Sequence, residues 1–192
     1  ILGIPATSFI TVLGSAGLAI GLAMQGSLSN LAGSLMILVF KPFKIGDLIE
    51  FGTVKGTVED INLFYTVLHT NDNKVITCPN GNLSNKDIIN YSTKNTRRVD
   101  MVFNVVYDSD VDKVKALLWS CVESDERVLK DPAPTVNLTG QLENSLEFSV
   151  KMWCRSDDYW DIYYDTLEKV KKAFQIGGIK VPSKVLDIQI KK

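Results

Sequence analysis

The first forty residues of the chain, Ile1 to Phe40, contain no Asp, Glu, Lys, Arg or His. An uncharged apolar run of about 18 residues or more is long enough to cross the hydrocarbon core of a bilayer as a helix. Pro42 predicts where this helix stops, because helices usually end before the residue that precedes a proline. The run therefore predicts a membrane-spanning helix around which the rest of the chain is organised.

Glycine and alanine recur along this run in two sets. On a helical wheel drawn at about 100° per residue the sets lie on nearly opposite sides: Gly14, Gly17 and Gly21 on one, and Ala16, Ala19 and Ala23 on the other. The glycine face of one helix can receive the alanine face of a copy, and contacts of this head-to-tail kind close into a ring. The same spacing also occurs in helices of monomeric bundles, so the pattern alone leaves both interpretations open.

A flank between the two small-residue faces would line the centre of such a ring. It holds Thr11, Ser15, Leu18, Leu22 and Gln25. Two stacked rings of leucine make a hydrophobic constriction, which can close a pore by dewetting. We therefore predict that Leu18 and Leu22 form a pore gate and that the three polar residues of the flank line the pore. The opposite flank, with Leu13, Ile20 and Met24, is expected to face outward toward other helices or lipid.

The apolar run is interrupted by polar residues and a glycine between Gln25 and Asn30. Glycine costs a helix about 1 kcal/mol relative to alanine, and sharp bends are found at Gly and Ser, so Gly26 is the predicted hinge. Lys41 and Lys44 follow the run at once. Lysine close to a membrane exit marks the cytoplasmic side, so the remaining chain is expected in the cytoplasm.

The segment Gly14 to Leu31 resembles the pore-lining helix of the mechanosensitive channels of small conductance, and Phe40 to Asp47 resembles its exit into the soluble domain. The resemblance implies a homoheptamer in the bacterial inner membrane, with two further membrane helices ahead of this one. Membrane tension would open its pore to ions and small osmolytes. In the family's pattern Leu18 and Leu22 match the gate leucines, and Gly26 matches the bend of the pore helix.

The resemblance also implies a junction between the lower pore helix and the soluble domain. Asn30 and Gly81 match the positions that couple the two parts in the family, and Lys41 and Lys44 lie at the exit. A second interpretation of Asn30, as a helix cap after the bend, remains open. The family often has a flexible glycine where this chain has Ser34, so no second bend is assigned there.

From Ile45 to about Asn95 the chain consists of short runs rich in Val, Ile, Thr and aromatic residues, separated by turn signals such as Pro79-Asn80-Gly81. This pattern predicts a small all-β unit without a long helix, and it resembles the Sm-like β-domain of the same family. Aromatic and basic residues are not interleaved as RNA binding requires, and the net charge is −1. No nucleic-acid partner is therefore predicted.

The second half of the chain predicts a small α+β unit with the order strand, helix, strand, strand, helix. Segments 97–107 and 145–154 are strand-like, segments 111–122 and 160–174 are amphipathic, and Gly177 and Gly178 are expected to end the second helix. The predicted fold class is a membrane α-helix followed by cytoplasmic mixed domains. The predicted parts are a kinked pore helix (1–41), an Sm-like β-domain (42–96), a ferredoxin-like α+β domain (97–180) and a C-terminal strand for an oligomeric β-barrel (181–192).

The sequence offers no constellation for catalysis, for a cofactor or for a metal. Asp108 and Asp110 precede a predicted helix and suit capping better than metal binding. Cys78, Cys121 and Cys154 lack metal or disulfide spacing, and His69 has no nucleophile motif beside it. A non-enzymatic channel in contact with membrane lipids is thus expected. The alternative is a membrane-tethered oligomeric module that binds RNA, a nucleotide or a protein without channel activity.

Overall fold

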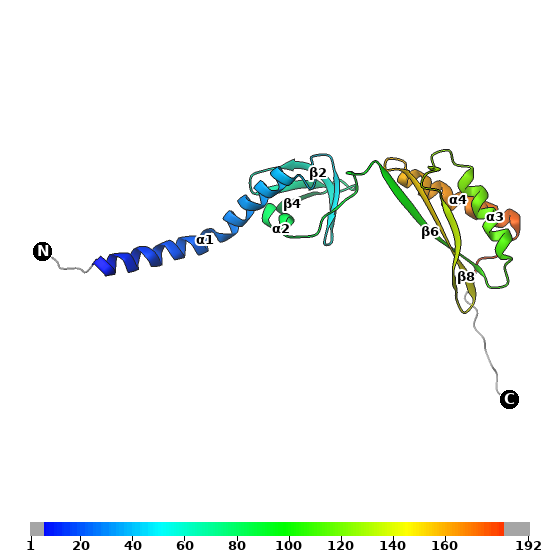
Figure 1. Cartoon of the computed structure of the whole chain (residues 1–192), viewed down its shortest axis with the longest axis horizontal. Coiled ribbons are helices and arrows are strands. Elements are labelled where there is room, and N and C mark those ends of the chain that lie inside the picture. Colours follow the sequence, from blue (N-terminus) through cyan, green and yellow to red (C-terminus); the bar gives the residue numbers. More distant parts are fainter. Residues whose placement is uncertain (1–5, 183–192) are drawn as a thin grey trace, which may run out of the picture. The chain divides into compact units, whose positions relative to one another are not determined.

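The computed structural model describes residues 6–182, which fall into two compact units that divide between Thr93 and Lys94 (Figure 1). The first unit contains the long N-terminal helix and a β-rich part. The second contains a sheet and two helices.

The first unit begins with α1 (Ala6–Phe40), one continuous helix whose ribbon is unbroken in Figure 1 although its axis changes direction partway along. The helix ends before Pro42, as predicted. Lys41 takes a left-handed conformation with φ 48°. Its N–H donates to the carbonyl oxygen of Ile37 at 2.9 Å, which is the αL type of helix cap. The hinge at Gly26 stays a prediction.

The β-rich part is an antiparallel five-stranded sheet with the strand order β4-β3-β2-β1-β5. Its elements are β1 (Leu48–Phe51), β2 (Val54–Ile61), β3 (Tyr65–His69), β4 (Val75–Pro79), α2 (Asn80–Ser84) and β5 (Ile89–Asn90). The all-β expectation holds except for α2, a five-residue helix formed where the sequence Pro79-Asn80-Gly81 had indicated only a turn.

The core of this unit joins the sheet to the C-terminal part of α1. Ile37 of α1 is 2% exposed and packs with buried residues of the sheet, of α2 and of the turn that follows α1. These include Phe43, Ile49, Val58, Leu68 and Leu83. Burial of one such aliphatic side chain stabilises a fold by about 1.5–3 kcal/mol. The C-terminal end of α1 is therefore anchored in the β-rich part.

The second unit has the element order strand, helix, strand, strand, helix that the sequence predicts. Its elements are β6 (Thr96–Val106), α3 (Val111–Glu123), β7 (Thr135–Gln141), β8 (Ser145–Arg155) and α4 (Tyr159–Gly177). The antiparallel sheet has the order β6-β8-β7, and Figure 1 shows both helices on the same side of it. Alternate residues of β6 are buried under the helices, so the period-2 pattern matches its sheet face.

Helix ends in this unit also follow the sequence. The Asp110 carboxylate accepts the N–H groups of Asp112 and Lys113 at 2.9 and 3.1 Å, which makes it the N-cap of α3. Gly178, with φ 70°, ends α4, and the N–H of Ile179 donates to the carbonyl oxygen of Phe174 at 2.9 Å. Residues 183–192 of the predicted C-terminal strand (181–192) lie outside the described residues.

Candidate functional site

The N-terminal part of α1 contacts no other part of the described chain. Leu18 and Leu22 are 66% and 64% exposed, and a β-carbon added to Gly14, Gly17 or Gly21 would meet no atom within 4 Å. The segment Thr7–Phe40 is long and apolar enough to span a membrane. Apolar surface of this extent is covered in a working protein by lipid or by another chain.

The predicted pore-lining flank lies along one stripe of this exposed helix. The hydroxyl of Thr11 donates to the carbonyl oxygen of Thr7 at 2.8 Å, and that of Ser15 donates to Val12 at 2.9 Å. Both hydroxyls are thus bonded within their own helix, which is a common arrangement for Ser and Thr in helices. The flank is consequently less polar than its sequence suggests on the N-terminal side of Leu18.

Two glycines allow α1 and α2 to meet at backbone distance. A β-carbon on Gly33 would stand 2.5 Å from the carbonyl oxygen of Asn80 and 2.7 Å from the nitrogen of Gly81. A β-carbon on Gly81 would stand 2.7 Å from the Ser29 hydroxyl oxygen. A side chain at Gly33 would therefore require a shift of the α1 or α2 backbone. At Gly81 the nearest obstacle is the Ser29 side chain, and the Ser29 carbonyl oxygen lies at 3.1 Å, so the close approach depends most on Gly33.

Asn30 and Gly81, the two residues expected to couple the helix to the soluble part, are in direct contact. The Asn30 side-chain oxygen accepts the N–H of Gly81 at 3.0 Å. The N-cap residue of α2 is Pro79, which supplies no side-chain hydrogen bond. Asn30 therefore supplies from α1 the cap that α2 lacks. The second interpretation expected Asn30 to cap its own helix after a bend, but Asn30 lies within the continuous α1 and caps α2 instead.

A buried polar network that the sequence did not indicate surrounds this contact. Asn80 is fully buried, and its side-chain N–H donates to the carbonyl oxygen of Asn62 at 2.8 Å while its side-chain oxygen accepts the Thr66 hydroxyl at 2.7 Å. The Ser34 hydroxyl of α1 donates to the same Asn62 carbonyl at 3.3 Å. The sequence signal that could have pointed to this network is Ser34, a hydroxyl residue within the apolar run. Such satisfied buried networks fix one arrangement of the groups they join.

Lys41 and Lys44 lie at the exit of α1 with exposed side chains. Lys41 caps the helix through its backbone, and the N–H of Lys44 donates to the carboxylate of Asp47 at 3.0 Å. The structure gives both residues a backbone role in the turn that leads into β1. A coupling role for their side chains stays a prediction.

The described cysteines sit in the cores of the two units. Cys78, Cys121 and Cys154 are buried and free. Burial raises the pKa of all three thiols, which keeps them protonated at neutral pH. They behave as the small buried hydrophobes that the sequence had suggested.

Comparison with known proteins places the whole chain in one family. The family profile described as "Mechanosensitive ion channel, beta-domain" matches residues 26–93, and the one described as "Mechanosensitive ion channel MscS, C-terminal" matches residues 99–181. The small-conductance mechanosensitive channel of Edwardsiella ictaluri is 43% identical over 92% of this chain and 62% of its own length. An MscS family protein of Buchnera aphidicola subsp. Baizongia pistaciae is 41% identical over 100% of this chain and 68% of its own.

The fold agrees with a solved member of the same family. The crystal structure of Helicobacter pylori MscS in its closed state matches with a TM-score of 0.93 at 33% identity, over 100% of this chain and 76% of that one. The predicted fold class is thereby confirmed. This chain spans 62% and 68% of the length of the two relatives named above. The chain belongs to the MscS family of mechanosensitive ion channels.

Proposed function

We propose that this protein is an ion channel that membrane tension opens, and that it releases ions and small osmolytes on hypoosmotic shock. The observation that carries the proposal is the N-terminal part of α1. It is an uncharged helix with glycine and alanine on opposed faces, two exposed leucines between them, and no partner among the described residues. The names of its relatives support the same reading.

The assembly that suits this helix is a homo-oligomeric ring, and the resemblance favours seven copies in a bacterial inner membrane. The open space beside Gly14, Gly17 and Gly21 is the room that a neighbouring helix with an alanine ridge would fill. Leu18 and Leu22 would then face the axis and close the pore by dewetting. Lipids would contact the remaining outer surface, and the β-rich and α+β units would lie in the cytoplasm.

Opening follows from the difference in membrane area between the closed and open rings. Tension acts on the added in-plane area, so it favours the wider state by an amount that grows with tension. The part of α1 that follows Gly26 is held on the β-rich part by Gly33, Asn30 and Ile37. The part that precedes Gly26 is free to tilt about a hinge at that residue. In this mechanism the α1–α2 junction carries the movement of the pore helix into the cytoplasmic part.

The experiment that tests the function is patch-clamp recording of the full-length protein in liposomes under graded suction. Discrete currents that appear above a pressure threshold are expected. Liposomes without protein, and liposomes with a soluble protein added, are the controls. Silence up to the lytic tension would contradict the channel and would favour a membrane-tethered binding module.

A further inference from the structure

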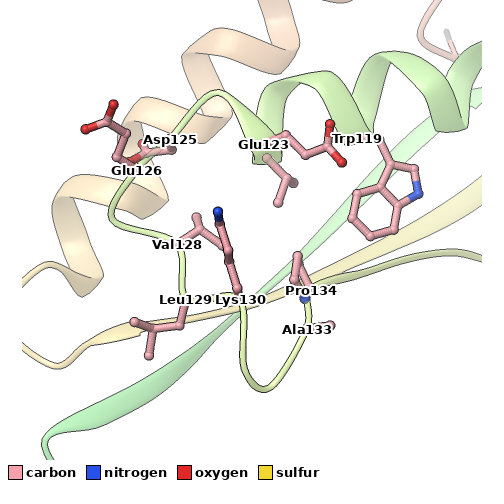
Figure 2. Close-up of a pocket in the computed structure, with 10 residues that line it drawn as sticks. Trp119, Glu123, Asp125, Glu126, Val128, Leu129, Lys130, Ala133 and Pro134 are labelled. Carbon is pink, nitrogen blue, oxygen red and sulfur yellow. The ribbon is translucent and has the colours of Figure 1, made fainter.

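The second unit contains a half-open pocket of about 720 Å³ that no part of the proposed channel mechanism uses. It lies between the C-terminal end of α3 and the loop that leads to β7 (Figure 2). Its volume is within the range of about 300–1,000 Å³ that is usual for small-molecule sites. Val122, Val128, Leu129 and Pro134 give it apolar walls, and Trp119 closes one side.

Four charged residues line the pocket, Glu123, Asp125, Glu126 and Lys130, and they differ in what they offer a ligand. Asp125 is engaged elsewhere, because Arg127 and Lys169 approach its carboxylate at 2.7 and 3.1 Å. The Arg127 guanidinium holds the pKa of that carboxyl well below its usual range. Figure 2 shows the Glu126 carboxylate turned away from the pocket. Lys130 and Glu123 remain, and within residues 6–182 neither forms an ion pair.

These two charges stand on different walls. Figure 2 shows the Lys130 side chain extending from its loop toward the end of α3, and the Glu123 carboxylate turned toward the Trp119 ring. A carboxylate close to an indole ring is a favourable setting for an ammonium group, because the negative charge and the ring quadrupole both attract a cation. The lysine on the opposite wall offers a cation to a carboxylate. The pocket is therefore complementary to a molecule that carries both charges.

We infer that this pocket binds a small zwitterion of the amino-acid type, with its carboxylate against Lys130 and its alkylated ammonium against Glu123 and Trp119. Glu123 would repel a ligand that carries only a negative charge, and Lys130 would repel one that carries only a positive charge. The apolar walls between the charges favour methyl groups on the nitrogen over a primary ammonium, which would lose hydrogen bonds to water there. The inference stands on the second unit alone and does not depend on channel activity.

Isothermal titration calorimetry of the full-length protein in detergent, with glycine betaine as the probe, tests this site. Saturable binding with one site per chain is expected. Glu123→Gln and Lys130→Gln should each weaken it about fivefold, the size expected for one partly exposed charge contact. Lys171→Gln removes an exposed lysine from α4, outside the pocket, and should leave the affinity unchanged. Unfolding temperatures of the variants control for misfolding.

Two probes that carry one charge each separate this site from nonspecific binding. Tetramethylammonium and acetate should each bind more weakly than glycine betaine, and Trp119→Leu should weaken tetramethylammonium binding more than acetate binding. The inference is overturned if glycine betaine shows no saturable binding. It is equally overturned if Glu123→Gln and Lys130→Gln both leave the binding isotherm as it is in the unmodified protein.

Discussion

Gly33 of α1 and Asn80 of α2 are so close that a β-carbon on Gly33 would stand 2.5 Å from the Asn80 carbonyl oxygen. At Gly33 the two helices thus meet through backbone atoms, beside the side-chain contact of Asn30 with Gly81. Backbone contact of this kind leaves little room for adjustment, since the atoms on both sides belong to regular helices. The junction is well suited to transmit a movement of α1.

Gly33→Ala should loosen this junction. The added methyl group forces α1 and α2 apart, at a cost of about 1–3 kcal/mol for overpacking a well-packed site. Hydrogen exchange of the α2 amides, measured by mass spectrometry on the full-length protein, should become faster. Gly26→Ala makes the same substitution in the same helix where a β-carbon meets no atom within 4 Å, and α2 exchange should not change. Equal exchange in both variants would contradict the close contact.

Asn30→Ala should expose the first turn of α2, because the N–H of Gly81 loses its acceptor. A lost hydrogen bond of this kind costs about 1 kcal/mol, so exchange of the Gly81 amide should accelerate by about fivefold. Asn30→Asp keeps an acceptor oxygen at the helix start and should retain protection. If the aspartate variant exchanged as fast as the alanine variant, the cap would not be what protects α2.

Local sequence signals were sufficient for the ends of the longer helices, although they missed the short helix α2. Pro42 gave the end of α1, Asp110 gave the start of α3, and Gly178 gave the end of α4, because each residue favours one backbone state for local reasons. The placement of glycine and alanine on opposite faces of α1 required only the 3.6-residue repeat of a helix. These predictions depend on near neighbours in the chain, which a sequence shows directly.

The junction between α1 and α2 could be predicted only in part. Asn30 and Gly81 were paired by resemblance, but Gly33, Asn62 and Asn80 were not assigned to it. Asn80 looked like a turn residue because its buried partners are 14 and 18 positions away in the chain. Hydrogen bonds between residues this far apart in the chain produce no repeating pattern in the sequence, so they can be identified only in the folded structure.

Leu22→Ser should lower the pressure at which the channel opens. Each copy loses an apolar side chain whose burial is worth about 1.5–3 kcal/mol and gains a hydroxyl at the proposed constriction. The closed pore therefore becomes easier to wet. The patch-clamp assay measures the ratio of opening to lytic pressure. Leu13→Ser makes the same change on the side of α1 predicted to face away from the pore. A shift that is as large for Leu13→Ser as for Leu22→Ser would count against the gate.

Gly21→Val should have the opposite effect and raise the opening pressure. The open space beside Gly21 is where a neighbouring alanine ridge is proposed to slide, and a branched side chain would obstruct it. Adding Ala19→Gly to the same chain shortens the opposing ridge and should bring the threshold partly back. The recordings would speak against direct packing between these faces if the second substitution had no effect on the first.

Asp125→Asn should destabilise the second unit at neutral pH and matter less in acid. The Asp125 side chain is 5% exposed and bound to Arg127 and Lys169, so its loss should cost about 1–3 kcal/mol. Arg127 lowers the folded-state pKa below the unfolded value of about 3.9, so the carboxylate stabilises the fold above that value. This stabilisation fades as the pH falls from about 4 toward the folded-state pKa.

Tryptophan fluorescence can follow this unit selectively, because all three tryptophans of the chain, Trp119, Trp153 and Trp160, belong to it. Denaturant titrations of the full-length protein should show a constant stability gap between unmodified and Asp125→Asn protein from pH 8 to about 6, and a narrowing gap below about pH 4. Asp157→Asn removes a carboxylate that is 88% exposed and should change stability little at any pH. A gap that widened in acid would reverse the sign of the linkage and contradict the assigned pKa shift.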